Sequence, residues 1–227
     1  MPFLPDLSFL YEIDLLVGLV FAAALIVLVA DWRVALYALT AQYLLTGLLL
    51  SQMIQPPAAI SRVFSGALAV VILFITLRRL TEERRAALTP PDGEPPVDWI
   101  ERLYRPEVFV VGFPFRFFAL ALVAVGIIGI ASSMTFLGLS AYVLFSGLWL
   151  IAAGILVAIV SRNVLRLGLG ILLFTNGFCV LQSGIEPSLF LYGLLTISDL
   201  LLAVVVSHLA TVTQEEVGIA RRRGEAQ

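Results

Sequence analysis

The 227 residues are 60% hydrophobic and 13% charged, too apolar for a water-soluble monomer, since soluble domains are about 45–50% apolar and about 25% charged. The net charge is −2 and all 14 basic residues are Arg, so the absence of Lys excludes a retinal Schiff base. Because His208 and Cys179 are the single His and Cys, bis-histidine haem, iron–sulfur and structural zinc sites are excluded, and the sequence predicts no cofactor and no metal.

Seven apolar runs are long enough to cross a bilayer. A spanning helix needs about 20 residues, because the hydrocarbon core is about 30 Å thick and a helix rises about 1.5 Å per residue. Helices are expected because lipid offers no hydrogen bonds to the backbone, and strand-like alternation is absent. The predicted fold class is an all-α, polytopic membrane helix bundle with about seven transmembrane helices. These cover residues 13–30, 34–54, 57–77, 113–133, 138–160, 164–183 and 188–210.

The largest interruption lies between the third and fourth runs, at residues 78–112. Its charged first part is expected to continue the third helix out of the membrane. Four prolines within residues 89–96 forbid a helix there and favour an extended linker. Residues 97–104 place Trp99 and Tyr104 among apolar residues at helical spacing. This segment is interpreted as a short interfacial helix, with an ordinary ordered loop as the alternative.

The positions of the arginines predict the orientation in the membrane. With seven spans, all of them fall on one side except Arg62. Loops rich in Lys and Arg face the cytoplasm. The N-terminus is therefore expected outside and the C-terminus in the cytoplasm.

The first three and the last three helices have the same predicted orientation, and the fourth connects them. Two pairs of segments match in sequence: 32–47 with 162–177, and 68–71 with 202–205. One interpretation is two parallel three-helix repeats; the other is chance matching between apolar sequences. The predicted units are an N-terminal three-helix unit, a cytoplasmic linker, a connector helix, a C-terminal three-helix unit and a cytoplasmic tail, at residues 1–80, 81–112, 113–134, 135–212 and 213–227.

Asp199 is the strongest candidate for a functional residue. It stands about ten residues from either end of the last apolar run, which places it about 15 Å from each membrane surface. A charged group at that depth costs free energy, so it usually has a structural or functional role. One interpretation is a carboxyl group that exchanges protons, and the other is a structural carboxyl group bonded to a neighbouring helix or subunit. Arg62, one to two turns into the third run, needs an anion, carbonyl groups or water, or it must extend to the surface.

Several uncharged polar residues also lie inside the apolar runs. The sixth and seventh runs are joined by a short loop, so Thr175, Asn176 and Asp199 are expected to form a polar layer. Such a layer either holds helices together or lines a path for water. Arg166 lies one turn inside the sixth run and can point inward. The proton-path candidates are Asp199, Asn176, Thr175, Arg166, Arg62 and Gln42; no residue is predicted to be catalytic, and the chain alone is not expected to be an enzyme.

The last three runs resemble a known family. SRNVLRLGLGILLFTNGFCVL, followed by a short loop and LYGLLTISDLLLAVVVSHLA, resembles hydrogenase-4 component E, a membrane subunit of formate hydrogenlyase-type and energy-converting hydrogenase-like complexes. The same part is similar to the small K subunit of complex I and to the C subunit of multisubunit cation/proton antiporters. The resemblance covers roughly residues 150–212, and the N-terminal half matches mainly in layout, with Arg62 where the family has a basic residue.

The resemblance implies a membrane subunit of a hydrogenase-4-like, complex I-related, proton-translocating assembly, with antiporter-like partner subunits. One departure bears on the mechanism: the intramembrane Glu of the related subunits falls on Leu172 or on Thr175, depending on the alignment. Asp199 is then the remaining buried carboxyl group. The alternatives are a subunit of a cation/proton antiporter or ion-coupled uptake complex without redox chemistry, a purely structural scaffold, and a stand-alone transporter.

Overall fold

The computed structural model describes residues 12–29, 31–53, 56–86, 112–133, 139–161, 163–186 and 188–224, and in these ranges it contains seven α-helices and no strand. The predicted all-α bundle is thereby confirmed. The helices are α1 (Glu12–Leu28), α2 (Trp32–Met53), α3 (Pro56–Ala86), α5 (Phe113–Ser133), α6 (Ala141–Val160), α7 (Val164–Ile185) and α8 (Leu189–Gly224).

Six of these helices are long and apolar enough to cross a bilayer, and α1 contributes a shorter apolar stretch, Ile13–Leu28. Their outer faces carry large apolar side chains, such as Phe64 on α3, Phe118 on α5 and Leu201 on α8. Faces of this kind require lipid or another apolar surface around them. The chain is a multi-pass membrane protein.

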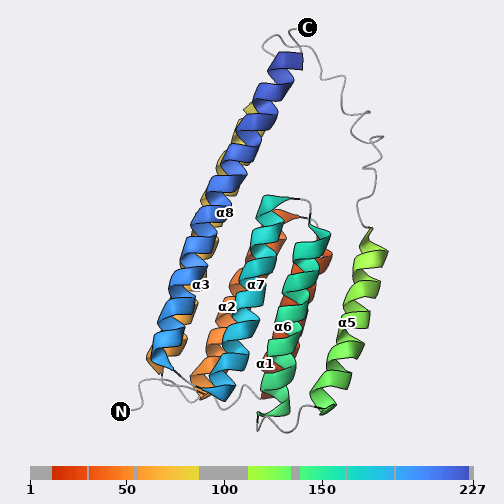
Figure 1. Cartoon of the computed structure of the whole chain (residues 1–227), viewed down its shortest axis with the longest axis vertical. Helices are drawn as coiled ribbons and strands as arrows, with labels where there is room; N and C mark the ends of the chain where they lie inside the picture. Colours follow the sequence, from red (N-terminus) through yellow and green to blue (C-terminus); the bar gives the residue numbers. More distant parts are fainter. Residues whose placement is uncertain are drawn as a thin grey trace.

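Two helices are longer than the apolar runs that predict them. The structure continues α3 to Ala86, which confirms the expected helical extension past the apolar run. It also continues α8 to Gly224, so most of the predicted tail at 213–227 is helical. Figure 1 shows α8 and α3 projecting together past the ends of α6 and α7. The predicted interfacial helix at 97–104 lies outside the described residues.

The helices form two layers, which Figure 1 shows one in front of the other. Helices α1, α2 and α3 pack against α6, α7 and α8 respectively, and α5 packs at the edge against α6 and α1. Helices α3 and α8 run in the same direction, because Arg62 and Thr76 on α3 contact Asp199 and Ser207 on α8 in the same order. The division into two three-helix repeats joined by a connector stays a prediction.

Local sequence explains where several helices begin. The Ser140 hydroxyl accepts a hydrogen bond from the Val143 amide at the start of α6, and the Asn163 side chain accepts one from the Leu165 amide at the start of α7. Both are N-caps, which satisfy amide groups that a helix start leaves free. Pro56 opens α3, where a missing N–H costs nothing.

Helices α6 and α7 approach each other closely at two pairs of glycines. A β-carbon at Gly154 would lie 2.6 Å from the Gly170 carbonyl oxygen, and one at Gly177 would lie 2.7 Å from the Gly147 carbonyl oxygen. The two glycines of each helix are seven residues apart and so share one face. Small residues of this kind let helix backbones pack tightly within a membrane.

Candidate functional site

An ion pair between α3 and α8 lies buried inside the bundle. Arg62 Nη1 is 2.7 Å from Asp199 Oδ2, and the two side chains are 1% and 0% exposed. Asp199 follows Leu189, the first residue of α8, by ten positions, which corresponds to about 15 Å of helix. Arg62 therefore points inward and does not extend to the surface, and the two charges compensate each other at mid-membrane depth.

Tyr43 of α2 completes the contact between these charges. Its hydroxyl group donates a hydrogen bond of 2.9 Å to Asp199 Oδ2, and the guanidinium carbon of Arg62 lies 5.4 Å from the centroid of its ring. A cation near an aromatic face is attracted to it. Gly66 of α3 makes room for the ring, since a β-carbon there would lie 2.7 Å from the β-carbon of Tyr43 and still closer to the ring.

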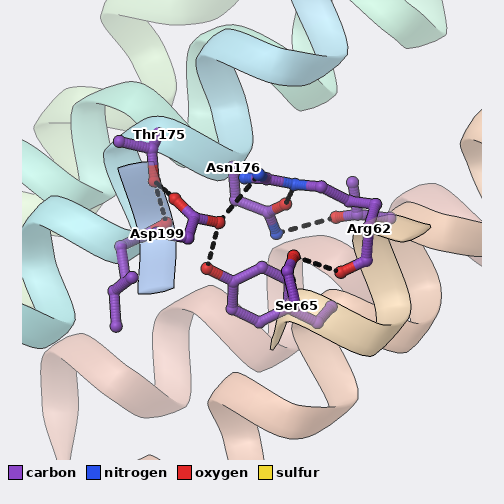
Figure 2. Close-up of polar contacts among 8 residues, drawn as sticks. Arg62, Ser65, Thr175, Asn176 and Asp199 are labelled. Carbon is purple, nitrogen blue, oxygen red and sulfur yellow. Dashed lines mark hydrogen bonds and ion pairs between the residues drawn. The ribbon is translucent and has the colours of Figure 1, made fainter. Parts of the chain in front are cut away.

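Two neighbouring residues of α7 bind the two charges separately. Thr175 donates a hydrogen bond of 2.8 Å to Asp199 Oδ1, and Asn176 accepts one of 3.3 Å from Arg62 Nε. Asn176 also donates to the Thr46 hydroxyl on α2, at 3.0 Å. Figure 2 shows these side chains converging from different helices. The structure brings Thr175, Asn176 and Asp199 together in the predicted polar layer, and it places Arg62 in the same layer.

Both oxygens of the Asp199 carboxylate are occupied, whereas Arg62 keeps donors to spare. Oδ1 accepts from Thr175 and Oδ2 from Tyr43. Arg62 Nη1 is in ion-pair contact with Oδ2 but lacks the alignment of a hydrogen bond, and Nη2 has no partner among the described residues. Buried polar groups usually find partners, so a leftover donor marks a place where water or a changed geometry can be accommodated.

Gln42 extends this polar region along α2. It is 0% exposed, and neither its amide nitrogen nor its carbonyl oxygen has a hydrogen-bond partner in the described part of the chain. Thr46 lies one turn further along the same face of the helix. The candidate site, defined here as Tyr43, Thr46, Arg62, Thr175, Asn176 and Asp199, is therefore flanked by a buried carboxamide able to bond further groups.

Arg166 lies apart from the candidate site. Its Nη2 atom donates to the Val29 carbonyl oxygen, at the end of the bundle where α1 finishes and α7 begins. Asn176 lies ten residues further along α7, which corresponds to about 15 Å. Of the six predicted proton-path residues, the structure thus joins four, places Gln42 one turn from Thr46, and separates Arg166.

Tyr43 was absent from the predicted candidates. A tyrosine in an apolar helix has no signal that separates it from an ordinary packing residue. An indirect signal was available in Gly66, four positions after Arg62. A glycine on that face of α3 leaves space for a ring from a neighbouring helix.

The described residues include no group of three or more His, Cys, Asp or Glu side chains able to hold a metal ion. The candidate site contains one carboxylate and one guanidinium group, a set suited to holding and moving charge. Comparison of the chain with protein-family models, with curated proteins and with solved structures finds no match.

Proposed function

We propose that this chain is a non-catalytic membrane subunit of a hydrogenase-4-like, complex I-related assembly that translocates protons. It would lie in a prokaryotic cytoplasmic membrane, with the N-terminus outside and the C-terminus inside. The observation that carries the proposal is the Arg62–Asp199 ion pair, buried at mid-membrane depth where four helices meet. The class of complex, with its antiporter-like partner subunits, rests on the resemblance of residues 150–212 to component E.

In the proposed mechanism Asp199 is the group that gains and loses a proton. Protonation removes its charge and releases Arg62 from the ion pair. The Tyr43 ring and Asn176 remain to hold the guanidinium group, and its unused Nη2 donor can bind water. A change of charge in a neighbouring subunit would shift this balance, because Coulomb interactions are strong where water is scarce.

The proton route would run sideways through the bundle. Thr175 is only partly buried and bonds to Asp199, so its hydroxyl group is the proposed link from the ion pair to the surface between α7 and α8. On the inner side Asn176 and Thr46 are hydrogen-bonded to each other, and the proposed route reaches the buried Gln42, one turn from Thr46, through water between them. Arg166 lies outside this route.

A structural scaffold is the rival supported by a specific observation, namely that both oxygens of Asp199 are occupied by protein donors. Such saturation is expected of a carboxyl group that only joins helices. Two other features favour a relay: among the described residues neither Arg62 Nη2 nor the carboxamide of Gln42 has a hydrogen-bond partner. Neither contributes to holding helices together, and each has a cost when it is left unsatisfied.

The test is Asp199→Asn, made in the complex that the chain forms in its membrane. Proton transport is measured in vesicles with a pH-sensitive dye, and assembly is measured by co-purification in mild detergent. We expect transport to fall at least tenfold while the complex remains assembled. Glu186→Gln is the control, because Glu186 is an exposed carboxylate after α7 whose removal should change neither quantity.

Full transport in an assembled Asp199→Asn complex would leave only the scaffold. Tyr43→Phe covers the case in which Asp199→Asn prevents assembly, since it removes one hydroxyl group and keeps the ring. The relay predicts slower transport for Tyr43→Phe. The proteins that co-purify also identify the complex: hydrogenase-like subunits support the proposal, and antiporter subunits alone support the ion-coupled alternative.

A further inference from the structure

A cavity of about 290 Å³ lies at the arginine-rich end of the bundle, remote from the candidate site. It is lined by residues near the starts of α2 and α7 and by the part of α3 that leaves the bundle. Figure 1 shows α3 and α8 continuing at this end beyond α6 and α7. The cavity is therefore at the level where the membrane interface is expected, with α3 as one wall.

The lining changes from polar to apolar with depth. At the outer end lie Thr81, Asn163 and Arg166, with Trp32 beside them. Asn163 uses its side-chain oxygen to cap α7, which leaves its amide group free to donate. Trp is the residue typical of the headgroup level of a membrane.

The deeper wall consists of leucines, each about one turn further into the membrane. Leu36 follows Trp32 by four residues, Leu73 precedes Leu77 by four, and Leu169 follows Leu165 by four; all of them line the cavity. Three helices thus show the same gradient. A molecule that fits such a lining has a polar head and an apolar chain.

Arg166 supplies the positive charge of the cavity lining, and it is partly buried. Arg116 on α5 acts on it electrostatically with a charge of the same sign. Arg116 is 7% exposed, and its Nε atom has no hydrogen-bond partner in the part of the chain that the structure describes. Among the described residues neither arginine forms an ion pair. Charges partly withdrawn from water are normally compensated, and among the described residues the hydrogen-bond partner of Arg166 is the uncharged Val29 carbonyl group.

We propose that this cavity binds an anionic phospholipid, with the phosphate at Arg166 and one acyl chain between the leucines. At about 290 Å³ the cavity lies near the lower end of the range of ligand pockets, about 300–1,000 Å³, which suits part of an acyl chain. Basic pockets between transmembrane helices on the cytoplasmic side are typical sites for anionic headgroups. A free phosphate would use the arginine and leave the leucine wall uncovered.

The experiment is native mass spectrometry of the full chain, purified in mild detergent with whatever subunits accompany it. Phosphatidylglycerol and phosphatidylcholine with identical acyl chains are titrated separately. We expect one tightly retained phosphatidylglycerol and clearly weaker phosphatidylcholine binding. Arg166→Ala should weaken phosphatidylglycerol binding roughly tenfold, since hydrogen bonds to charged groups are strong. Arg78→Ala, which removes an exposed arginine at the same end, should change nothing.

Two further measurements separate a lipid from other occupants. Leu169→Phe keeps the charge but fills the chain space, so lipid binding should fall while the helical content is unchanged. Millimolar inorganic phosphate should fail to displace the lipid. Equal phosphatidylglycerol binding by the wild-type chain, Arg166→Ala and Leu169→Phe would overturn the proposal, and displacement by phosphate would replace it with a free-anion site. Arg166→Lys should retain most of the binding, which excludes loss of folding as the cause.

Discussion

Gly66 lies directly against the ring of Tyr43, so that the smallest side chain at position 66 would overlap the residue that joins Arg62 to Asp199. The contact couples the packing of α2 on α3 to the geometry of the candidate site. Tyr43 can reach Asp199 on α8 only because α3 presents no side chain in its path.

Gly66→Ala should therefore damage the candidate site through packing alone. The added β-carbon forces the Tyr43 ring aside, and overpacking of this kind destabilises by about 1–3 kcal/mol. We expect a lower thermal stability in detergent and the same slower proton transport as for Tyr43→Phe. Gly126→Ala on α5 is the control, because a β-carbon there meets nothing within 4 Å. Equal stability of Gly66→Ala and Gly126→Ala would contradict the packing described here.

The Arg62–Asp199 pair should show strong energetic coupling. Removing one partner from a buried ion pair leaves an uncompensated charge and costs about 3–5 kcal/mol, whereas replacing both by apolar residues costs far less. Arg62→Met and Asp199→Leu should each destabilise the chain strongly, and the double variant should recover much of the loss. A double-mutant cycle on unfolding in detergent measures the coupling.

The exposed pair Arg78–Glu82 provides the comparison for that cycle. Its Nε–Oε1 distance is 3.0 Å, close to that of the buried pair, but its side chains are 68% and 63% exposed. Exposed pairs four residues apart on a helix contribute about 0.3–0.5 kcal/mol. Similar coupling energies for the two pairs would mean that water reaches the Arg62–Asp199 pair as freely as it reaches the surface.

The close approach of α6 and α7 yields a prediction about the frame of the bundle. A β-carbon at Gly154 would meet backbone atoms, the Gly170 oxygen and the Phe174 nitrogen, both at 2.6 Å. Because backbone atoms cannot rotate away, Gly154→Ala must push the helices apart, and we expect a loss of at least about 1–3 kcal/mol. Gly193→Ala on α8, where a β-carbon meets nothing within 4 Å, should be neutral or slightly stabilising. Thermal unfolding of both variants in detergent checks the difference.

The helices and part of the candidate site could be predicted from the sequence. Apolar length predicts a spanning helix from bilayer thickness alone, and Asp199, Asn176 and Thr175 are conspicuous because polar groups are rare in such runs. Which helices lie beside each other is much harder to predict, because these helices are apolar on every side. No polar face therefore shows which side of a helix contacts its neighbours. The contacts of Arg62 with Asp199, and of both with Tyr43, depend on which helices are neighbours, so they could not be predicted.

The helical ends were predicted less well where hydropathy was the guide. Residues 211–224 are too polar to extend an apolar run, but they include two Glu and three Arg, which favour helix in water. The structure accordingly extends α8 to Gly224. Hydropathy thus marks where the membrane ends, while helix propensity decides where the helix ends.

The predicted orientation can be tested with two residues at opposite ends of the bundle. Gln52, near the end of α2, and Arg78, in the extended part of α3, are both exposed. In a Cys179→Ala background, Arg78→Cys should react with an impermeant thiol reagent only when the cytoplasmic side is accessible, and Gln52→Cys only from outside. The parent chain is a built-in control, because its single Cys179 is buried and should not react from either side. The opposite labelling pattern would reverse the orientation and move the arginine-rich end of the bundle to the outer surface, where the positive-inside rule predicts few basic residues.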